Sequence, residues 1–157
     1  MDEKAYLVQA VEEARKTMLE NHGGPFGALL VDTKDGSTYL ASNTVLSSHD
    51  PTAHAEVNAI RKACKAKKNH DLSGCILYTT CYPCPMCLSA CIWANIKTVY
   101  YGCTPQDAKA IGFRDDFIYK FIETGCTDTS VLNLQHLDRS VCIPLFEGYA
   151  ALKKELY

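Results

Sequence analysis

The first third of the chain changes from helical to extended spacing of its apolar residues. Five apolar positions near the start fall close to the helical period: Tyr6, Leu7, Val11, Ala14 and Leu19. This spacing predicts a helix over residues 3–20. After a glycine-rich break, the apolar runs 28–32 and 37–46 predict two strands, joined by a turn at Asp35-Gly36.

The rest of the chain alternates between helix-like and strand-like segments. Asp50-Pro51-Thr52 predicts the start of a helix that continues to about Lys68, because proline favours the first turn of a helix. The patterns that follow predict a strand over 75–80, a helix from Pro83 to about Asn95, a strand over 97–103, short helices from 104 and over 114–123, a strand or extended segment over 130–137, and a final helix over 144–157. This alternation predicts an α/β fold, a single three-layer α/β/α domain over residues 1–157.

Composition narrows the class of protein. A formal charge of −2 and a pI of about 6.2 give no global electrostatic argument for a nucleic-acid partner. The acidic start lacks the features of a signal peptide, and no apolar run reaches the ~18 residues of a membrane span. We therefore expect a cytoplasmic protein with no membrane partner. Its nine cysteines cannot all pair within one chain, so we expect thiols and metal ligands.

Four cysteines cluster in the stretch CYPCPMCLSAC: Cys81, Cys84, Cys87 and Cys91. Their spacing is compatible with an iron–sulfur ligand run, but Ile92 follows where that run has proline, and a second run is missing. The alternative is a zinc site in which Cys84 and Cys87 form a Pro-Cys-x-x-Cys pair. We favour zinc and interpret Cys81 and Cys91 as small buried hydrophobic residues, with Cys81 as a conceivable fourth ligand.

The upstream stretch TAHAEVNAI supplies the rest of the pattern. His54-Ala55-Glu56 followed by Pro-Cys-x-x-Cys is the ligand signature of zinc-dependent deaminases. We expect His54, Cys84 and Cys87 in the first turns of two helices, whose partial positive charge favours thiolates. Three protein ligands leave a tetrahedral zinc one open position for water, which is typical of a catalytic site with one Zn²⁺ per chain.

Several longer blocks extend this pattern: GGPFGA (23–28), DPTAHAEVNAIRKACK (50–65), CILYT (75–79), PCPMCL (83–88), GFRDDFIYK (112–120) and the end KKELY. Together they resemble the bacterial guanine deaminases of the cytidine-deaminase-like superfamily. The resemblance implies a mixed five-stranded sheet between helices and the hydrolysis of guanine to xanthine and ammonia. It also implies a small-molecule purine as partner rather than a nucleic acid.

The resemblance implies roles for individual residues. Zinc would be held by the three ligands named above, with Glu56 as proton shuttle and Asp115 in contact with the guanine. The residues that would contact or enclose the base are Phe26, Asn43, Ala55 through its backbone, Trp93 and the terminal Tyr157. The chain departs from the family at Tyr82 and Arg114, and a loop shift of one residue would give Asp116 the role of Asp115.

The apolar stripe of the final helix needs a surface to pack on. The resemblance implies that the tail, about residues 141–157, closes over an active site, and we expect a homodimer in which the tail covers either its own site or, through exchanged tails, that of the partner. The alternatives are a tRNA adenosine deaminase, another small-base or nucleoside deaminase (cytosine, guanosine or amino-triazine), and a catalytically silent zinc module. The basic run RKACKAKK (61–68) is the support for tRNA, and we favour its interpretation as a solvated helix face.

Overall fold

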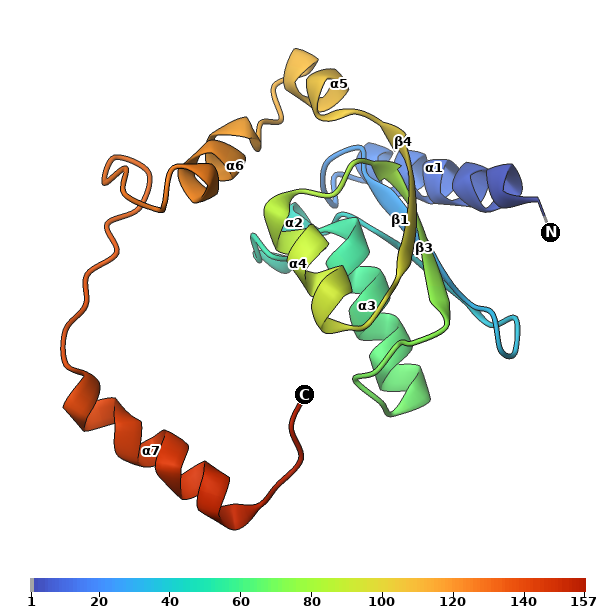
Figure 1. Ribbon diagram of the computed structural model, residues 1–157. Coiled ribbons are helices and arrows are strands. Elements are labelled where there is room, and N and C mark those ends of the chain that lie inside the picture. Colours follow the sequence, from blue (N-terminus) through green and yellow to red (C-terminus); the bar gives the residue numbers. More distant parts are fainter. Residues whose placement is uncertain (1) are drawn as a thin grey trace. The chain divides into compact units, whose positions relative to one another are not determined.

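The computed structural model describes residues 2–157, which divide into two compact units, 2–115 and 116–157. The first unit is built on a four-stranded sheet of order β2-β1-β3-β4 (Figure 1). Its strands are β1 (Gly27–Asp32), β2 (Thr38–Ser42), β3 (Cys75–Cys81) and β4 (Thr98–Cys103). Its helices are α1 (Glu3–Leu19), α2 (Val45–Ser48), α3 (Ala55–Lys67), α4 (Pro85–Trp93) and α5 (Pro105–Ala110).

The sheet is mixed, as predicted. β1 pairs antiparallel with both β2 and β3, with Leu29 opposite Leu40 and Leu30 opposite Leu77. β3 and β4 run parallel, joined by α4, with Tyr78 opposite Tyr100. The parallel pair therefore delivers the chain that follows β3 and the chain that follows β4 to the same edge of the sheet.

Alternate residues of β1 face two different layers. Leu30 belongs to a core with Ala59 of α3 and Cys91 of α4, whereas Leu29 packs with Tyr6 of α1 on the opposite face. Helix α1 lies very close to the sheet: a Cβ atom on Gly27 of β1 would overlap the carbonyl group of Ala10 of α1, so the close approach requires glycine at this position. The first unit thus has the predicted three layers, with α3 and α4 side by side on one face (Figure 1).

The second unit holds α6 (Asp116–Glu123) and α7 (Arg139–Leu152). The predicted fifth strand is wrong: residues 130–137 pair with no strand of the described chain, which leaves a sheet of four. The Asp128 side chain accepts a hydrogen bond from the amide of Ser130, and the amide of Val131 donates to the Asp128 carbonyl. The first residues of the segment 130–137 therefore belong to this turn. The backbone of the remaining residues forms no ladder of hydrogen bonds with another strand of the described chain.

Two helix boundaries also differ from prediction. The Asp50 side chain accepts hydrogen bonds from the amide and hydroxyl of Thr52, so Asp50-Pro51-Thr52 forms a turn and α3 starts only at Ala55. The last helix starts earlier than predicted, at Arg139, where Asp138 caps it through the Ser140 amide. Over residues 2–157, none of the helices is both long and apolar enough to cross a membrane.

Candidate functional site

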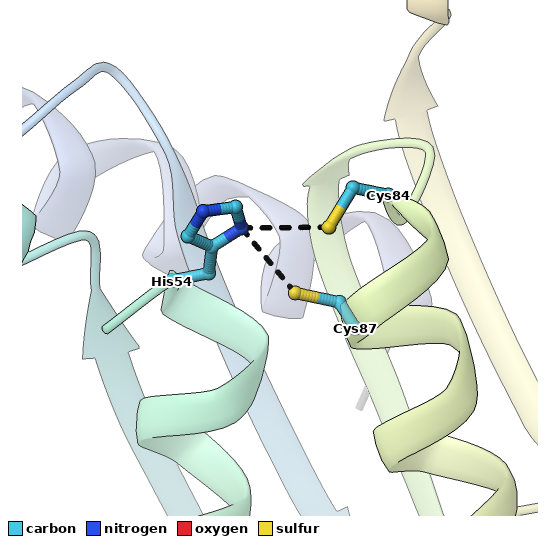
Figure 2. A group of neighbouring side chains, drawn as sticks. All are labelled: His54, Cys84 and Cys87. Atoms are coloured by element: carbon cyan, nitrogen blue, oxygen red, sulfur yellow. Dashed lines mark hydrogen bonds between the residues drawn. The ribbon is translucent and has the colours of Figure 1, made fainter. Parts of the chain in front are cut away.

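Three metal-ligand side chains converge where α3 and α4 begin. His54 and Cys84 are the N-cap residues of these helices, and Cys87 lies in the first turn of α4. His54 Nδ1 lies 3.5 Å from the Sγ atom of each cysteine, and the three ligand atoms lie within 4.8 Å of one another (Figure 2). Two helix N-termini, each with partial positive charge, thus face the same point.

The geometry of these ligands fits zinc. Zn–N bonds of about 2.0–2.1 Å and Zn–S bonds of about 2.3 Å at a tetrahedral angle separate nitrogen and sulfur by about 3.6 Å. The two 3.5 Å separations match that value. Cys81 lies outside the group: its Sγ is 3.7 Å from the Thr104 carbonyl oxygen, and burial raises the pKa of its thiol to about 11. The site therefore offers three protein ligands, which is the number in an open catalytic zinc site.

The three ligand side chains share protons and hydrogen bonds with one another. A hydrogen bond from Cys87 lowers the pKa of Cys84 to about 4, and the same bond raises the pKa of Cys87 above its ordinary value. A hydrogen bond with Cys84 raises the pKa of His54 despite burial. Cys84 therefore favours the thiolate, whereas a metal ion would displace the protons that Cys87 and His54 hold, and the affinity of the site for a metal would depend on pH.

Glu56 lies beside the ligands in the first turn of α3. Its side chain is only 6% exposed, and burial raises the pKa of its carboxyl group. It lines the same cavity as His54 and Cys84. A buried carboxyl group at a cavity wall can exchange a proton with a molecule bound in the cavity.

The cavity has a volume of about 500 Å³, in the range of small-molecule sites. The polar side chains that line it, besides the metal ligands, are Asn43, Glu56, Arg114 and Asp115. Its remaining walls are small or apolar: Gly23, Gly24, Phe26, Val45, Leu46, Pro51, Cys81, Tyr82, Ala108 and Phe113. All of these residues belong to the first unit.

Aromatic rings stiffen two walls of the cavity. Phe26 and Phe113 meet edge to face, with ring centroids 5.1 Å apart at 89°. Tyr82, one of the departures from the family pattern, meets Tyr101 at 5.0 Å and 79°. A Cβ atom on Gly24 would lie 3.0 Å from the ring of Phe26, so glycine there permits the aromatic pair to approach the backbone.

Not all predicted site residues lie in this cavity. His54, Glu56, Cys84, Phe26, Asn43 and Asp115 line it, and Ala55 is buried at the start of α3. Trp93 ends α4 with 71% of its surface exposed and is not among the lining residues. Tyr157 belongs to the second unit and is 88% exposed. Contact of Trp93 and Tyr157 with a base therefore stays a prediction.

Phe113 and the two glycines of the cavity wall were not predicted as site residues. Phe113 lies in the block 112–120 that carries part of the family resemblance, two residues before the predicted Asp115. Its place in this block is the sequence feature from which a site role could have been predicted. Gly23 and Gly24 carry no side-chain chemistry, and their role comes only from what surrounds them. Cys91, by contrast, is a core residue as interpreted, and burial raises the pKa of its thiol to about 12.

The family of known proteins that this chain matches is one of zinc-binding deaminases, which agrees with the three convergent ligands. Residues 1–103 match the family model of the cytidine and deoxycytidylate deaminase zinc-binding region. Guanine deaminase of Bacillus subtilis is 47% identical over 132 residues, 83% of each chain. Its X-ray structure aligns with a TM-score of 0.91 and 41% identity over 100% of this chain and 99% of that one.

Less similar relatives include a tRNA-specific enzyme and a second guanine deaminase. The tRNA-specific adenosine deaminase of Buchnera aphidicola is 32% identical over 86% of this chain and 85% of its own length. A guanine deaminase structure from Nitrosomonas europaea is 30% identical, with a TM-score of 0.66 over 71% of this chain and 64% of that one. The match over residues 1–103, which include all three convergent ligands, establishes that this chain belongs to the zinc-binding cytidine and deoxycytidylate deaminase family of hydrolases.

Proposed function

We propose that the chain is a zinc-dependent aminohydrolase that converts guanine to xanthine and ammonia. The observation that carries the proposal is one cavity that is lined by the buried carboxyl group of Glu56, the amide of Asn43, the carboxyl group of Asp115, two of the three metal ligands and aromatic rings. A flat, polar-edged base suits such a space. The similarity to guanine deaminase of B. subtilis over most of the chain supports this base over others.

The metal would be held by His54, Cys84 and Cys87. When bound, zinc supplies Lewis acidity that lowers the pKa of a water molecule to about 7. Glu56 then acts as the proton carrier: its carboxylate takes a proton from the attacking water and delivers it to the ring nitrogen beside C2. That protonation makes C2 more electrophilic. After the water oxygen has bonded to C2, Glu56 takes the second proton of that water and delivers it to the amino nitrogen, whose bond to C2 breaks as ammonia leaves.

The remaining cavity residues would bind and orient the base. The edge of guanine that carries its amino group is rich in N–H donors, and the carboxylate of Asp115 is an acceptor for such groups. Asn43 offers both a donor and an acceptor from the buried side of the cavity. Phe26, held edge to face by Phe113, would enclose the ring and exclude water. Trp93 and Ala55 complete the set of residues that we propose to contact the base.

The basic run of α3 gives little support to a tRNA substrate. Arg61 contacts Asp50 and Thr52, Lys62 donates a hydrogen bond to the Leu40 carbonyl, and Lys67 pairs with Asp32. Contacts within the chain therefore engage three of the five basic residues that would otherwise face phosphates. We propose a free purine base, rather than a nucleic acid, as the partner.

We also propose that the protein is a homodimer and that its C-terminal tail closes an active site. The second unit carries apolar side chains that are largely exposed, with Leu145 at 75% and Phe146 at 70%. Such a helix needs an apolar partner surface. Tyr157 would shut water out of a site, in its own subunit or, through exchanged tails, in the partner's, and a dry site strengthens the electrostatic effect of Glu56.

The test is ammonia release from a panel of compounds by zinc-loaded protein. The panel contains guanine, guanosine, adenine, adenosine, cytosine, an amino-triazine and a tRNA. We expect kcat/KM for guanine to exceed that for each other compound by about tenfold or more. Preference for cytosine would reject the assigned base. Turnover of tRNA with a steep dependence on salt would favour the tRNA-specific relatives instead.

A further inference from the structure

The loop between β2 and α3 carries a residue of the cavity at each end. Asn43 follows β2, and His54 precedes α3. Between them, Val45, Leu46 and Pro51 also line the cavity. The separation of the proposed base-binding amide from the metal ligand therefore depends on how the two ends of this loop are held together.

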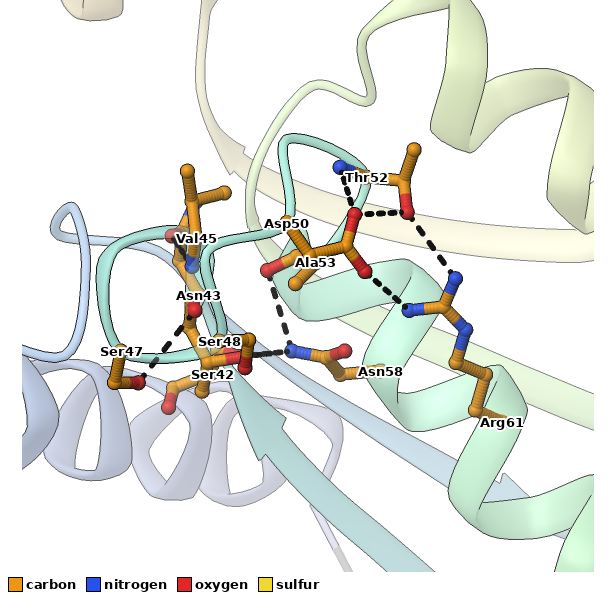
Figure 3. Close-up of polar contacts among 11 residues, drawn as sticks. Ser42, Asn43, Val45, Ser47, Ser48, Asp50, Thr52, Ala53, Asn58 and Arg61 are labelled. Carbon is orange, nitrogen blue, oxygen red and sulfur yellow. Dashed lines mark hydrogen bonds and ion pairs between the residues drawn. The ribbon is translucent and has the colours of Figure 1, made fainter.

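One side chain joins both ends. Asn58, in the second turn of α3, lies within donating distance of three oxygen atoms (Figure 3). Its Nδ2 is 2.8 Å from the carbonyl oxygen of Ser42, 3.0 Å from Oγ1 of Thr44 and 3.2 Å from the carbonyl oxygen of Ala53. Ser42 and Thr44 flank Asn43, and Ala53 directly precedes His54.

The backbone supports the same connection but does not replace it. The amide of Thr44 donates to the Ala53 carbonyl at 3.0 Å, and the amide of Asn58 donates to the His54 carbonyl at 2.9 Å. The Asn58 side chain adds the link to Ser42, the last residue of β2, which these backbone bonds do not reach. The Asn43 side chain is oriented in turn, because its Oδ1 accepts a hydrogen bond from the Val45 amide at 3.0 Å.

We propose that Asn58 is a positioning residue for the reaction: its side-chain amide fixes Asn43 and His54 relative to each other. The role of Asn43 in this statement rests on the proposed function, whereas the effect on His54 needs only the metal site. The two N–H groups of Asn58 serve three acceptors, so removing them leaves partly buried carbonyl oxygens without this donor. A loosened loop would weaken base binding more than it would unfold the protein.

The experiment compares Asn58→Leu, Asn58→Asp and Arg61→Ala with the wild type. Leucine and aspartate both keep the approximate size of asparagine but cannot donate the two N–H bonds at neutral pH. Arg61 lies on the same helix and contacts the exposed part of the same loop, at Asp50 and Thr52, so its removal is the matched control. The measurements are kcat and KM for guanine, thermal unfolding, and the rate at which a chromogenic chelator removes zinc.

We expect both Asn58 variants to fold and bind zinc, with KM for guanine raised about tenfold and zinc released about tenfold faster. Arg61→Ala should stay within about twofold of the wild type in both quantities. A merely structural role would lower the melting temperature and the active fraction, hence kcat, without changing KM. An unchanged KM or an unchanged rate of zinc release in the leucine variant overturns the inference. If the wild type does not turn over guanine, the proposed function fails, and zinc release alone decides the role of Asn58.

Discussion

Gly23 and Asn43 lie so close together that a Cβ atom on Gly23 would overlap the side-chain oxygen and the backbone carbonyl of Asn43. Gly23 therefore sets the position of the amide that we assign to base binding. Gly23→Ala must displace either the loop before β1 or the start of the loop after β2. We expect a loss of stability of about 1–3 kcal/mol and a rise in KM for guanine.

Gly36→Ala is a suitable control for that substitution, with one difference taken into account. A Cβ at Gly36 meets nothing within 4 Å, but the backbone there has a φ of 75°, which costs stability without touching the cavity. Thermal unfolding and steady-state kinetics separate the two effects. Equal KM values in the two glycine variants would show that Gly23 does not hold Asn43 in place.

Glu56→Gln should retain zinc and fold normally, because the amide has nearly the same shape as the carboxyl group. It cannot carry a proton between water and the base, so we expect kcat to fall by about 10²–10⁴-fold. Zinc content by metal analysis and kcat on guanine are the two measurements. Near-normal turnover would show that Glu56 carries no proton in the reaction and that its negative charge only stabilises the N-terminus of α3.

Asp115→Asn should lower guanine turnover more than it lowers stability. The amide presents N–H donors on one side, where the proposed base edge also presents donors. Asp116→Asn is the matched control, because Asp116 is the first residue of α6 and is not among the residues lining the cavity. Kinetics on both variants test the alignment: a larger loss at Asp116 would mean that the loop register is shifted by one residue.

The metal site could be predicted from the sequence because its signals are local. His54 and Glu56 are two residues apart, Cys84 and Cys87 are three apart, and each pair begins a helix. Only the meeting of the two pairs needed a fold: β2 and β3 are both antiparallel to β1, so they run in the same direction and bring the starts of α3 and α4 to the same edge of the sheet. The prediction that His54 and Cys84 lie inside the first helical turns is wrong in detail, because both are N-cap residues with extended backbone.

Features that depend on a distant partner could not be predicted in this way. Residues 130–137 have strand-like composition, but a strand requires a neighbouring strand, and the described chain provides none for them. Phe113 becomes a wall residue only because the loop after α5 brings it against Phe26. Asn58 looks like an ordinary polar residue on a helix until Ser42, Thr44 and Ala53 are placed around it.

Removal of residues 155–157 tests the proposed role of the tail. The deletion leaves α7 complete, since that helix ends at Leu152. We expect zinc content and melting temperature to change little, and guanine turnover to fall about tenfold or more because water enters the site. Light scattering should report a dimer for the full chain. Full activity in the truncated protein would show that Tyr157 is not needed for closure, and a strict monomer would exclude exchanged tails.

A partly buried ion pair joins the end of α3 to the end of β1 and gives the protein an acid-sensitive component of stability. Asp32 is only 1% exposed and pairs with Lys67, the last residue of α3. The hydrogen bond from Lys67 lowers the pKa of Asp32, and a hydrogen bond from the Lys34 amide at 2.9 Å acts in the same direction. Burial opposes both effects but does not reverse them.

The sign of the pH dependence follows from the lowered pKa. Asp32 binds a proton less readily in the folded chain than in the unfolded one, so its pairing stabilises the fold at pH values above about 3.9, the ordinary pKa of aspartate. That stabilisation is lost as the pH falls through the lowered pKa.

Lys67→Met should therefore melt a few degrees below the wild type at pH 6–7, on the order of 2–4 °C. The difference should start to shrink below about pH 4 and disappear below the lowered pKa of Asp32, where its carboxyl group is protonated in both proteins. Lys65→Met, an exposed change of the same charge on the same helix, should show a smaller difference. Melting curves at several pH values decide the matter, and a gap between wild type and Lys67→Met that stays constant into acid would assign the effect to lost packing of the lysine stem instead of the ion pair.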